Sequence, residues 1–419
     1  MKVYLRTFGC RANHYDTEAV RELIERGGHS ITESVADADA ALFNSCTVTA
    51  DAEADLRQAV RRAARDRPGL RSVIMGCAAA LPDGARPPAA RLAALPSVQA
   101  TVGGADLSAV AAALDLPREV GAVRTHAQAG TRALLRVQDG CDEHCTFCAT
   151  TLARGANRSR TAAVLVRETG LLAERHAEIV ITGIHIGSYG VDIGTTLAAL
   201  MERLVRDVPR VRFRLSSIEA TEVDDRLAEL FAAVPDRLAP HIHAPLQSGS
   251  DRLLRRMGRN WYTSAAYSRA IERLAARLPT FGLGADVIAG FPGETDADHR
   301  ETLALIERLP FTYLHVFPYS HRPGTAAERI PGRVDPGVIR HRAAELRAHG
   351  DRAGAMHRQR RAGAVADVVA TGRGPRPDGL TEDYLTVQCE PAAGAHLKRF
   401  AARLVLDGGR MRAVPIASA

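Results

Sequence analysis

The feature that most constrains the fold is a strand-then-helix alternation that runs twice along the chain. In residues 1–118, four short apolar runs are predicted to be strands, and helical segments such as "DAEADLRQAVRRAARD" separate them. From residue 132 to about 320 the alternation restarts with six further apolar runs. Alternation of this kind indicates βαβ units, whose strands pair in parallel. The ten predicted strands are "KVYLRTFG", "AALFNSCTV", "SVIMGCAA", "VQATVGG", "RALLRVQDG", "EIVITGIHIG", "VRFRLSSIE", "HIHAPLQSG", "GADVIAGFPG" and "YLHVFPYS".

The second stretch predicts a partial barrel. Six βα repeats with no sign of a seventh or eighth suggest an open (β/α)6 relative of the eight-unit barrel. A long Arg/Ala-rich helix is expected at about 335–360, and short strand-like pieces with Gly and Pro between them follow, which is typical of a small all-β module. The fold class is therefore α/β, and its predicted parts are a parallel-sheet α/β domain (1–118), a linker (119–130), the barrel (131–360) and the β module (361–419).

Composition places the chain among soluble globular proteins. Hydrophobic residues make up 46% and charged residues 25% of its 419 residues, which is ordinary for that class. No apolar run approaches the length of a membrane span, and the N-terminal "MKVYLRTFGC" is neither a signal peptide nor a transit peptide. We therefore expect a cytoplasmic protein with no membrane partner. In that reducing compartment the seven cysteines are better explained as ligands or nucleophiles than as disulfides.

Three cysteines in "GCDEHCTFC" follow directly on the first predicted barrel strand, at the rim where barrel enzymes keep their chemistry. Cys141, Cys145 and Cys148, the barrel trio, have C-x3-C-x2-C spacing, and Phe147 precedes the last of them. A structural zinc ion takes four protein ligands, although three cysteines could serve a catalytic zinc. Three thiolates can also hold a [4Fe–4S] cluster and leave one iron open. An open iron can chelate a small molecule, so the missing fourth ligand is the functional position.

A second set, Cys10, Cys46 and Cys77, is spread along the first domain, and we name it the N-terminal trio. Each cysteine ends a predicted strand, in "TFGC", "FNSC" and "MGC". Ligands gather outside the carboxyl ends of parallel strands, so these three thiols could meet at one point. Singly, each is more often a buried apolar residue; together they indicate a second cluster with an open iron. Cys389 lies outside both trios and is interpreted as a structural thiol.

The barrel trio at the start of six βα repeats resembles the radical S-adenosylmethionine (SAM) superfamily. The resemblance implies that the open iron holds the methionyl group of SAM, whose reduction releases a 5′-deoxyadenosyl radical that abstracts hydrogen from an unactivated carbon. It also implies SAM contacts in "TGIHIGSYG", "SSIEA", "APLQSGS" and "DVIAGFPGET". The candidate cofactor-binding residues are Phe147, Ser217, Glu219, Gln247 and Asp286. The alternative for each polar one is a residue that caps a helix or satisfies a strand end.

The whole chain resembles the radical-SAM methylthiotransferases. "TFGCRANHYDTEAV", "FNSCTVTADAEADLRQAVRR" and "VIMGCAA" are similar to the N-terminal domain of that family, and the module around "GLTEDYLTV" is similar to a TRAM domain. "HYDTEA", "SSIEA" and "LHVFPYSHRPGTAAER" look most like the branch that acts on threonylcarbamoyladenosine in tRNA. The resemblance implies two [4Fe–4S] clusters and two uses of SAM, one to methylate a sulfur carried on the auxiliary cluster and one to form the radical. It also implies tRNA, a sulfur donor and a reductant such as flavodoxin or ferredoxin as partners.

Two short segments depart from the family pattern, and both lie next to a cysteine. Relatives typically have Pro and a large residue where "CATTLARG" has Thr151 and Leu152, and Tyr and Gln where "GCAAA" has Ala78 and Ala80. These departures reflect either neutral drift or adaptation to a different substrate. They leave open a family member recruited to natural-product biosynthesis, which would insert or exchange sulfur in a nucleoside-like small molecule. A non-catalytic RNA-binding protein with structural clusters would not explain why both trios lack a fourth ligand.

The charge pattern permits a nucleic-acid partner without requiring one. The net charge is +7, and residues 361–419 hold eight Lys/Arg against six Asp/Glu. Arg154, Arg158 and Arg160 could contact phosphates, and Trp261 could stack on a base. The alternative for most of these arginines is a solvated helix surface.

Overall fold

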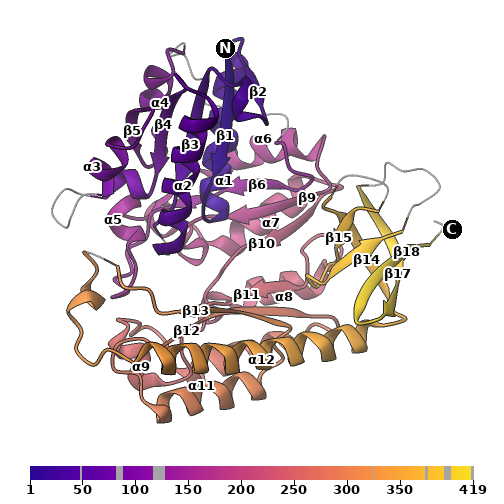
Figure 1. The fold of residues 1–419 in the computed structure, drawn as a ribbon. Coiled ribbons are helices and arrows are strands. Elements are labelled where there is room, and N and C mark those ends of the chain that lie inside the picture. Colours follow the sequence, from indigo (N-terminus) through magenta and orange to yellow (C-terminus); the bar gives the residue numbers. More distant parts are fainter. Residues whose placement is uncertain are drawn as a thin grey trace.

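Three sheet systems follow one another along the chain (Figure 1). The structure is a computed structural model that describes residues 1–47, 50–81, 88–116, 128–322, 324–372, 376–390 and 398–416. Most of the predicted linker, residues 119–127, lies outside these ranges. Within them, no helix combines the length and apolarity that crossing a bilayer requires.

The first sheet is parallel throughout, in the order β2-β1-β3-β4-β5. Apolar side chains cover both of its faces, and every residue of β3 is buried, as expected for a parallel sheet between helices. The sequence pattern missed β2, because three residues at a sheet edge carry no apolar alternation. The strands are β1 (Lys2–Thr7), β2 (Ser30–Thr32), β3 (Ala40–Ser45), β4 (Arg71–Gly76) and β5 (Val98–Gly103), and the helices are α1 (Arg11–Arg26), α2 (Ala50–Asp66), α3 (Pro88–Ala93) and α4 (Leu107–Ala113).

The order of this sheet reverses between β1 and β3, since the chain runs outward from β1 to β2 and then returns to the other side of β1. At such a switch point the helices that follow the two strands lie on opposite faces, which leaves a crevice at the carboxyl ends of the strands. Phe8 directly follows β1, and Cys46 directly follows β3, so both residues lie at this crevice.

The six predicted barrel strands are all present and parallel, in two three-stranded halves with the orders β10-β9-β6 and β11-β12-β13. Isolated parallel bridges, Phe213 with Leu238 and Ser217 with His243, connect the halves. One continuous apolar core fills the space between strands and helices, so the prediction of an incomplete barrel is confirmed. The strands are β6 (Ala133–Arg136), β9 (Glu178–Thr182), β10 (Arg212–Leu215), β11 (His241–His243), β12 (Gly282–Ala289) and β13 (Tyr313–Pro318).

The helices of the barrel begin at sequence signals of the expected kind. Thr295 and Asp298 form a capping box at the start of α11, and Asp335 caps α12 immediately before a proline. α12 runs beneath β12 and β13 and ends beside the β module (Figure 1). The helices are α5 (Thr150–Arg154), α6 (Ala162–Ala173), α7 (Leu197–Asp207), α8 (Asp225–Ala233), α9 (Asp251–Arg256), α10 (Ser264–Ala275), α11 (Asp296–Arg308) and α12 (Pro336–Arg361), and a short ribbon pairs β7 (Gln138–Asp139) with β8 (Arg158–Ser159).

The β module is a closed five-stranded barrel in the order β14-β15-β16-β18-β17. Four of its strands are predicted, whereas β15 is too short and too polar to show in the pattern. Cys389 is buried in the module's apolar core, which agrees with a structural thiol. The strands are β14 (Val365–Ala370), β15 (Asp378–Leu380), β16 (Thr386–Cys389), β17 (Arg399–Asp407) and β18 (Arg410–Pro415).

Candidate functional site

The N-terminal trio lies where three adjacent strands end. Cys10 is the N-cap of α1 just after β1, Cys46 directly follows β3, and Cys77 directly follows β4. All three line one cavity of about 580 Å³. Gly9 allows the close approach of two of them, because its φ is +98° and a Cβ there would lie 2.6 Å from Cys46 Sγ. The structure thus brings together three cysteines that are far apart in sequence.

Two polar side chains, Asn13 and Arg154, contact sulfur atoms of the N-terminal trio. Asn13 Oδ1 lies 3.8 Å from both Cys10 Sγ and Cys77 Sγ. Arg154 donates from Nε to Cys77 Sγ at 3.3 Å and from Nη2 to Asn13 Oδ1 at 2.6 Å. Burial raises the pKa of Cys77 to about 11, so this thiol keeps its proton until a metal centre displaces it.

The barrel trio lies in the loop between β7 and α5. Gly140 fixes the entry to this loop, because its φ is +74° and a Cβ there would lie 1.9 Å from the carbonyl oxygen of Ala156. The Cys148 amide donates to the Cys145 carbonyl at 3.1 Å and folds the loop back on itself. Burial raises the pKa of Cys145 to about 12.

An arginine also supports the barrel trio. Arg259 donates from Nη1 to Cys145 Sγ at 3.5 Å, and its Nη2 is ion-paired with Glu219. His185 Nδ1 lies 3.7 Å from Cys141 Sγ. Each trio therefore has one sulfur that accepts a hydrogen bond from a buried guanidinium, which in turn is held by a carboxylate.

Neither trio is arranged as a preformed single-ion site. Thiolates bound at 2.3 Å around one tetrahedral zinc ion lie about 3.8 Å apart. In the described part of the chain, neither trio brings its three sulfur atoms within 4.8 Å of one another, and only His243, Asp286 and His315 form a set that close.

A buried arginine lies next to the N-terminal trio. Arg322 pairs with Glu53 at 3.8 Å and interacts electrostatically with Cys46. Its Nε and Nη2 atoms have no hydrogen-bond partner among the described residues. These two N–H groups could therefore serve a further anionic group at this position.

The candidate cofactor-binding residues do not form one group. Phe147, Gln247 and Asp286 line a cavity of about 160 Å³ on the barrel-trio side. Ser217 lines the larger cavity beside the N-terminal trio, and Asp286 lines both cavities, so the two adjoin. Glu219 lines neither of them and lies behind Cys145, bound to Arg259.

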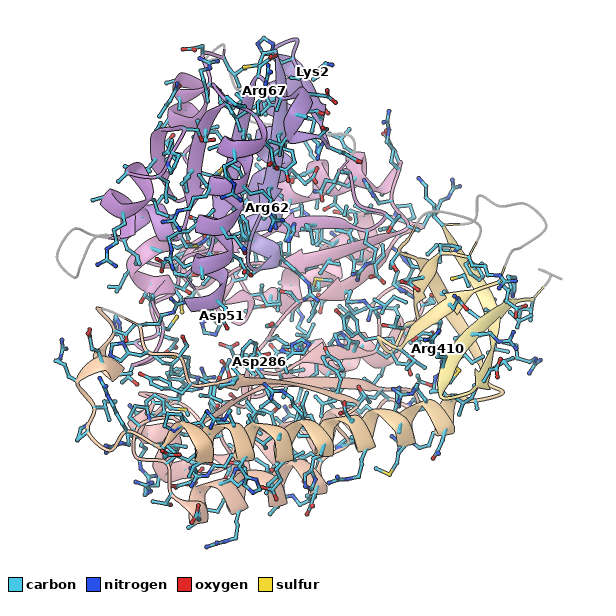
Figure 2. The ribbon with its side chains drawn as sticks, viewed as in Figure 1. Lys2, Asp51, Arg62, Arg67, Asp286 and Arg410 are labelled. Atoms are coloured by element: carbon cyan, nitrogen blue, oxygen red, sulfur yellow. The ribbon has the colours of Figure 1, made fainter. Side chains whose placement is uncertain are left out.

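Asp286 is the centre of a hydrogen-bonded group that the sequence pattern did not reveal. Its Oδ1 accepts from His243 Nε2 at 2.9 Å and lies 3.3 Å from His315 Nδ1. Burial opposes ionisation, but these two histidines hold the pKa of Asp286 well below its ordinary value. Figure 2 shows Asp286 on β12, and the lining of the larger cavity places it across from the N-terminal trio. Strand register could have found this group, since Asp286 and His315 are direct partners in the β12–β13 pair.

Two of the arginines that could contact phosphates are bound inside the protein. Arg154 is buried beneath the N-terminal trio, and Arg160 is bound to Glu168 and to Tyr15. Trp261 packs against the barrel core with the Arg259 guanidinium 4.8 Å from its ring centroid. Of these residues, Arg158 has the most exposed side chain.

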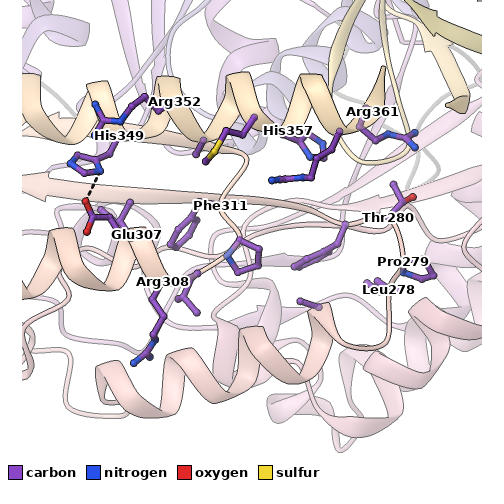
Figure 3. Close-up of a pocket in the computed structure, with 18 residues that line it drawn as sticks. Leu278, Pro279, Thr280, Glu307, Arg308, Phe311, His349, Arg352, His357 and Arg361 are labelled. Carbon is purple, nitrogen blue, oxygen red and sulfur yellow. Dashed lines mark ion pairs between the residues drawn. The ribbon is translucent and has the colours of Figure 1, made fainter. Parts of the chain in front are cut away.

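A further cavity, of about 700 Å³, lies between α12 and the segment that joins α10 to β12 (Figure 3). His349 and Glu307 form an ion pair across it at 3.3 Å. Its lining includes none of the six trio cysteines. Size alone therefore does not identify the site.

Two protein-family models match the chain. Residues 2–87 match Uncharacterized protein family UPF0004, and residues 135–306 match the radical SAM superfamily. Over 411 residues the chain is 34% identical to the threonylcarbamoyladenosine tRNA methylthiotransferase MtaB of Bacillus subtilis (strain 168), covering 92% of this chain and 89% of the relative. The chain belongs to the radical-SAM methylthiotransferase family. It is therefore an enzyme, and its superfamily uses a [4Fe–4S] cluster and SAM.

Other relatives of this methylthiotransferase carry two different names. The MtaB of Thermotoga maritima is 34% identical over 386 residues, with 88% of this chain and 86% of the relative covered. The tRNA-2-methylthio-N(6)-dimethylallyladenosine synthase of Syntrophobacter fumaroxidans is 33% identical over 370 residues, with 83% and 79% covered. Among solved structures, the radical SAM methyltransferase TsrM from Kitasatospora setae shares the fold, with a TM-score of 0.57, 16% identity, and 78% of this chain and 76% of that chain covered.

Proposed function

We propose that this enzyme methylthiolates threonylcarbamoyladenosine in tRNA, with the sulfur carried on an auxiliary [4Fe–4S] cluster. The observation that supports this most directly is the larger cavity, which is lined by the N-terminal trio on one side and by barrel strand ends on the other. It adjoins the cavity lined by Phe147 next to the barrel trio. An acceptor held there would be within reach of both metal centres. The identity to MtaB over 411 residues supports the choice of nucleoside.

In this proposal the barrel trio holds the cluster that binds SAM, and the N-terminal trio holds the auxiliary cluster. Bound together, the clusters and SAM supply the radical and the sulfur. The chain supplies orientation: Phe147, Gln247 and Asp286 enclose the smaller cavity, where SAM would lie. Arg259 and Arg154 donate to one cysteine sulfur of each trio and limit how those ligands can move.

The larger cavity suits a modified purine. A volume of about 580 Å³ is within the usual range for small-molecule sites. Ser216, Ser217 and Thr182 line the cavity from the strand ends, and His315 lines it from β13. His243 also lines it, but its two ring nitrogens are bound to Asp286 and Tyr313. The serine and threonine hydroxyl groups can donate to and accept from the edge of a base without filling the space that the ring needs.

The partners follow from the same proposal. The β module would contact the tRNA backbone, and Arg403 and Arg410 lie exposed on its strands. We place the enzyme in the cytoplasm with its tRNA, a sulfur donor and a reductant such as flavodoxin or ferredoxin.

The departures from the family pattern do not favour a changed substrate. Ala78 is buried in the apolar core on one face of the N-terminal sheet, and Leu152 is 47% exposed at the surface. Neither of these residues, nor Ala80 or Thr151, lines either cavity beside the trios. Drift therefore accounts for them better than recruitment to a small-molecule pathway.

The substrate assignment is tested with tRNA that carries threonylcarbamoyladenosine but no methylthio group. Reconstituted enzyme is incubated anaerobically with this tRNA, SAM, sulfide and a reductant, and the digested nucleosides are analysed by mass spectrometry. The expected product is the methylthio derivative of threonylcarbamoyladenosine. Abundant 5′-deoxyadenosine with the tRNA unchanged would instead favour a nucleoside-like small-molecule substrate.

A further inference from the structure

Arg154 connects the two cysteine trios through a set of short, directed contacts. Its Nε donates to Cys77 Sγ at 3.3 Å, and its Nη2 donates to Asn13 Oδ1 at 2.6 Å and to Asp16 Oδ2 at 2.8 Å. Its Nη1 donates to Asp139 Oδ1 at 3.1 Å. All three guanidinium nitrogens are therefore used, and the side chain is only 1% exposed.

The partners of Arg154 are themselves fixed. Asp16 is fully buried and also accepts from Arg136 Nη1 at 2.5 Å. Asn13 donates from Nδ2 to the backbone carbonyl of Ser45 at 2.8 Å, next to Cys46. The guanidinium of arginine keeps its proton in proteins, and the carboxylates of Asp16 and Asp139 hold it in place. The structure thus holds a permanent positive charge against the sulfur of Cys77.

The place of Arg154 in the chain ties this charge to the other trio. Arg154 ends α5, the single helical turn that follows Cys148. Gly155, at φ +70°, turns the chain there, and its carbonyl accepts from the Cys141 amide at 3.0 Å. The same turn therefore fixes a ligand of the barrel trio and aims Arg154 at a ligand of the N-terminal trio.

We propose that Arg154 is a positioning residue that orients Cys77 and stabilises the more reduced state of the auxiliary cluster. The inference rests on the proposed function for the existence of that cluster. Hydrogen bonds to cluster sulfurs and nearby positive charge set the reduction potential of iron–sulfur clusters. Reduction adds negative charge, so a fixed cation that donates an N–H to a ligand sulfur favours the reduced form and raises the potential.

Arginine suits this role better than lysine. Its planar fork can hold Asn13, Asp16 and Asp139 while one N–H is left for the sulfur, whereas an ammonium group is a point charge on a flexible stem. Arg259 repeats the arrangement at the barrel trio, where it donates to Cys145 and pairs with Glu219.

The test compares Arg154→Gln and Arg154→Lys with the parent holoenzyme in anaerobic redox titrations followed by electron paramagnetic resonance. No tRNA is added, so the result is independent of the substrate assignment. In Arg154→Gln the auxiliary cluster is expected to bind its electron at least tenfold more weakly. Its reduction potential should therefore fall by at least about 59 mV, the value for a tenfold change in a one-electron couple. Arg154→Lys keeps the charge and is expected to lose only part of this. The barrel-trio cluster serves as an internal reference, and Arg206→Gln is the matched control, because Arg206 is an exposed arginine of α7 that pairs with Asp207.

The possible outcomes test the role of Arg154 separately from the existence of the auxiliary cluster. A potential that is lowered in Arg154→Gln, partly restored in Arg154→Lys and unchanged in Arg206→Gln supports the inference. Two clusters with unchanged potentials in both Arg154 variants would overturn it while leaving the proposed function standing. A parent enzyme with iron for only one cluster would overturn the auxiliary cluster and the inference with it. If Arg154→Gln fails to assemble, the potential measured in Arg154→Lys decides between the first two outcomes.

Discussion

At the residue scale, two glycines allow the backbone to pack closely beside the two cysteine trios. Gly9 and Gly140 both have positive φ, and a Cβ at either would collide, with Cys46 Sγ in the first case and with the carbonyl oxygen of Ala156 in the second. Gly9→Ala is therefore expected to displace the N-terminal trio, and Gly140→Ala the barrel trio. Reconstituted protein should hold about eight irons in the parent and about four in each variant.

The two glycine variants should differ in one activity. Gly9→Ala should still cleave SAM to 5′-deoxyadenosine, whereas Gly140→Ala should not. Gly69→Ala is the matched control, because its φ is +83° but no atom lies within 4 Å of the added Cβ. Loss of iron in Gly69→Ala equal to that in the other two would show that positive φ alone, rather than proximity to a trio, causes the effect.

The residues of the site could be predicted only in part, because some residue types reveal their role in the sequence and others do not. Cysteines at strand ends stand out because few other roles explain them, so both trios could be proposed from spacing and position. Arg154 could not be recognised as a partner of Cys77, since an arginine in an Arg-rich chain carries no signal of burial. Glu219 was singled out, but its contact is with Arg259, which lies 40 residues further along the chain.

At the element scale, the sequence pattern revealed some short strands and not others. The three-residue strand β11 was found within the βα alternation of the barrel, whereas the three-residue strands β2 and β15 were not found. Pairing with a neighbour defines such short strands, and their own residues show no period. The N-terminal sheet and the barrel could therefore be predicted with their strand ends, and the β module only as a class.

The β module is expected to lose stability at high pH because of one buried thiol. Burial raises the pKa of Cys389 from its ordinary value of 9.0 to about 11. Between these values the unfolded chain releases the proton and the folded chain keeps it, so stability falls as the pH rises from 9 to 11. The loss is expected to be at most about 2.7 kcal/mol, from about 1.4 kcal/mol for each pKa unit.

Urea unfolding of the cluster-free chain at several pH values measures this dependence. Cys389→Ala should be less stable than the parent at pH 8 by about 1 kcal/mol, because it leaves a small cavity. The difference between the two proteins should shrink as the pH approaches 11. A difference that stays constant over the whole range would contradict the assignment to Cys389.

At the scale of the whole molecule, a buried ionic group joins the barrel to the β module. Glu178 on β9 is fully buried and pairs with Arg212 at 2.7 Å and with Arg214 at 3.0 Å. Arg212 also pairs with Asp367 of the module at 2.9 Å, and Arg214 donates to the Thr381 carbonyl at 2.9 Å. The two arginines are thus shared between the barrel floor and the module.

Glu178→Gln should weaken this joint, because it leaves two buried guanidinium groups with less counter-charge. Breaking a buried pair from one side typically costs about 3–5 kcal/mol, and the urea midpoint should fall accordingly. Glu202→Gln removes a carboxylate from the exposed pair with Arg226 and should cost no more than about 1 kcal/mol. Equal effects of the two substitutions would refute a special role for the buried group.

In the proposed reaction, the barrel trio serves radical formation and the N-terminal trio serves sulfur delivery. The most direct measurement is a single reaction with threonylcarbamoyladenosine-containing tRNA, in which 5′-deoxyadenosine and the methylthio nucleoside are both quantified. With Cys10, Cys46 and Cys77 all replaced by Ala, 5′-deoxyadenosine should still form and the methylthio nucleoside should be absent. Continued formation of the methylthio nucleoside by this variant would contradict the account.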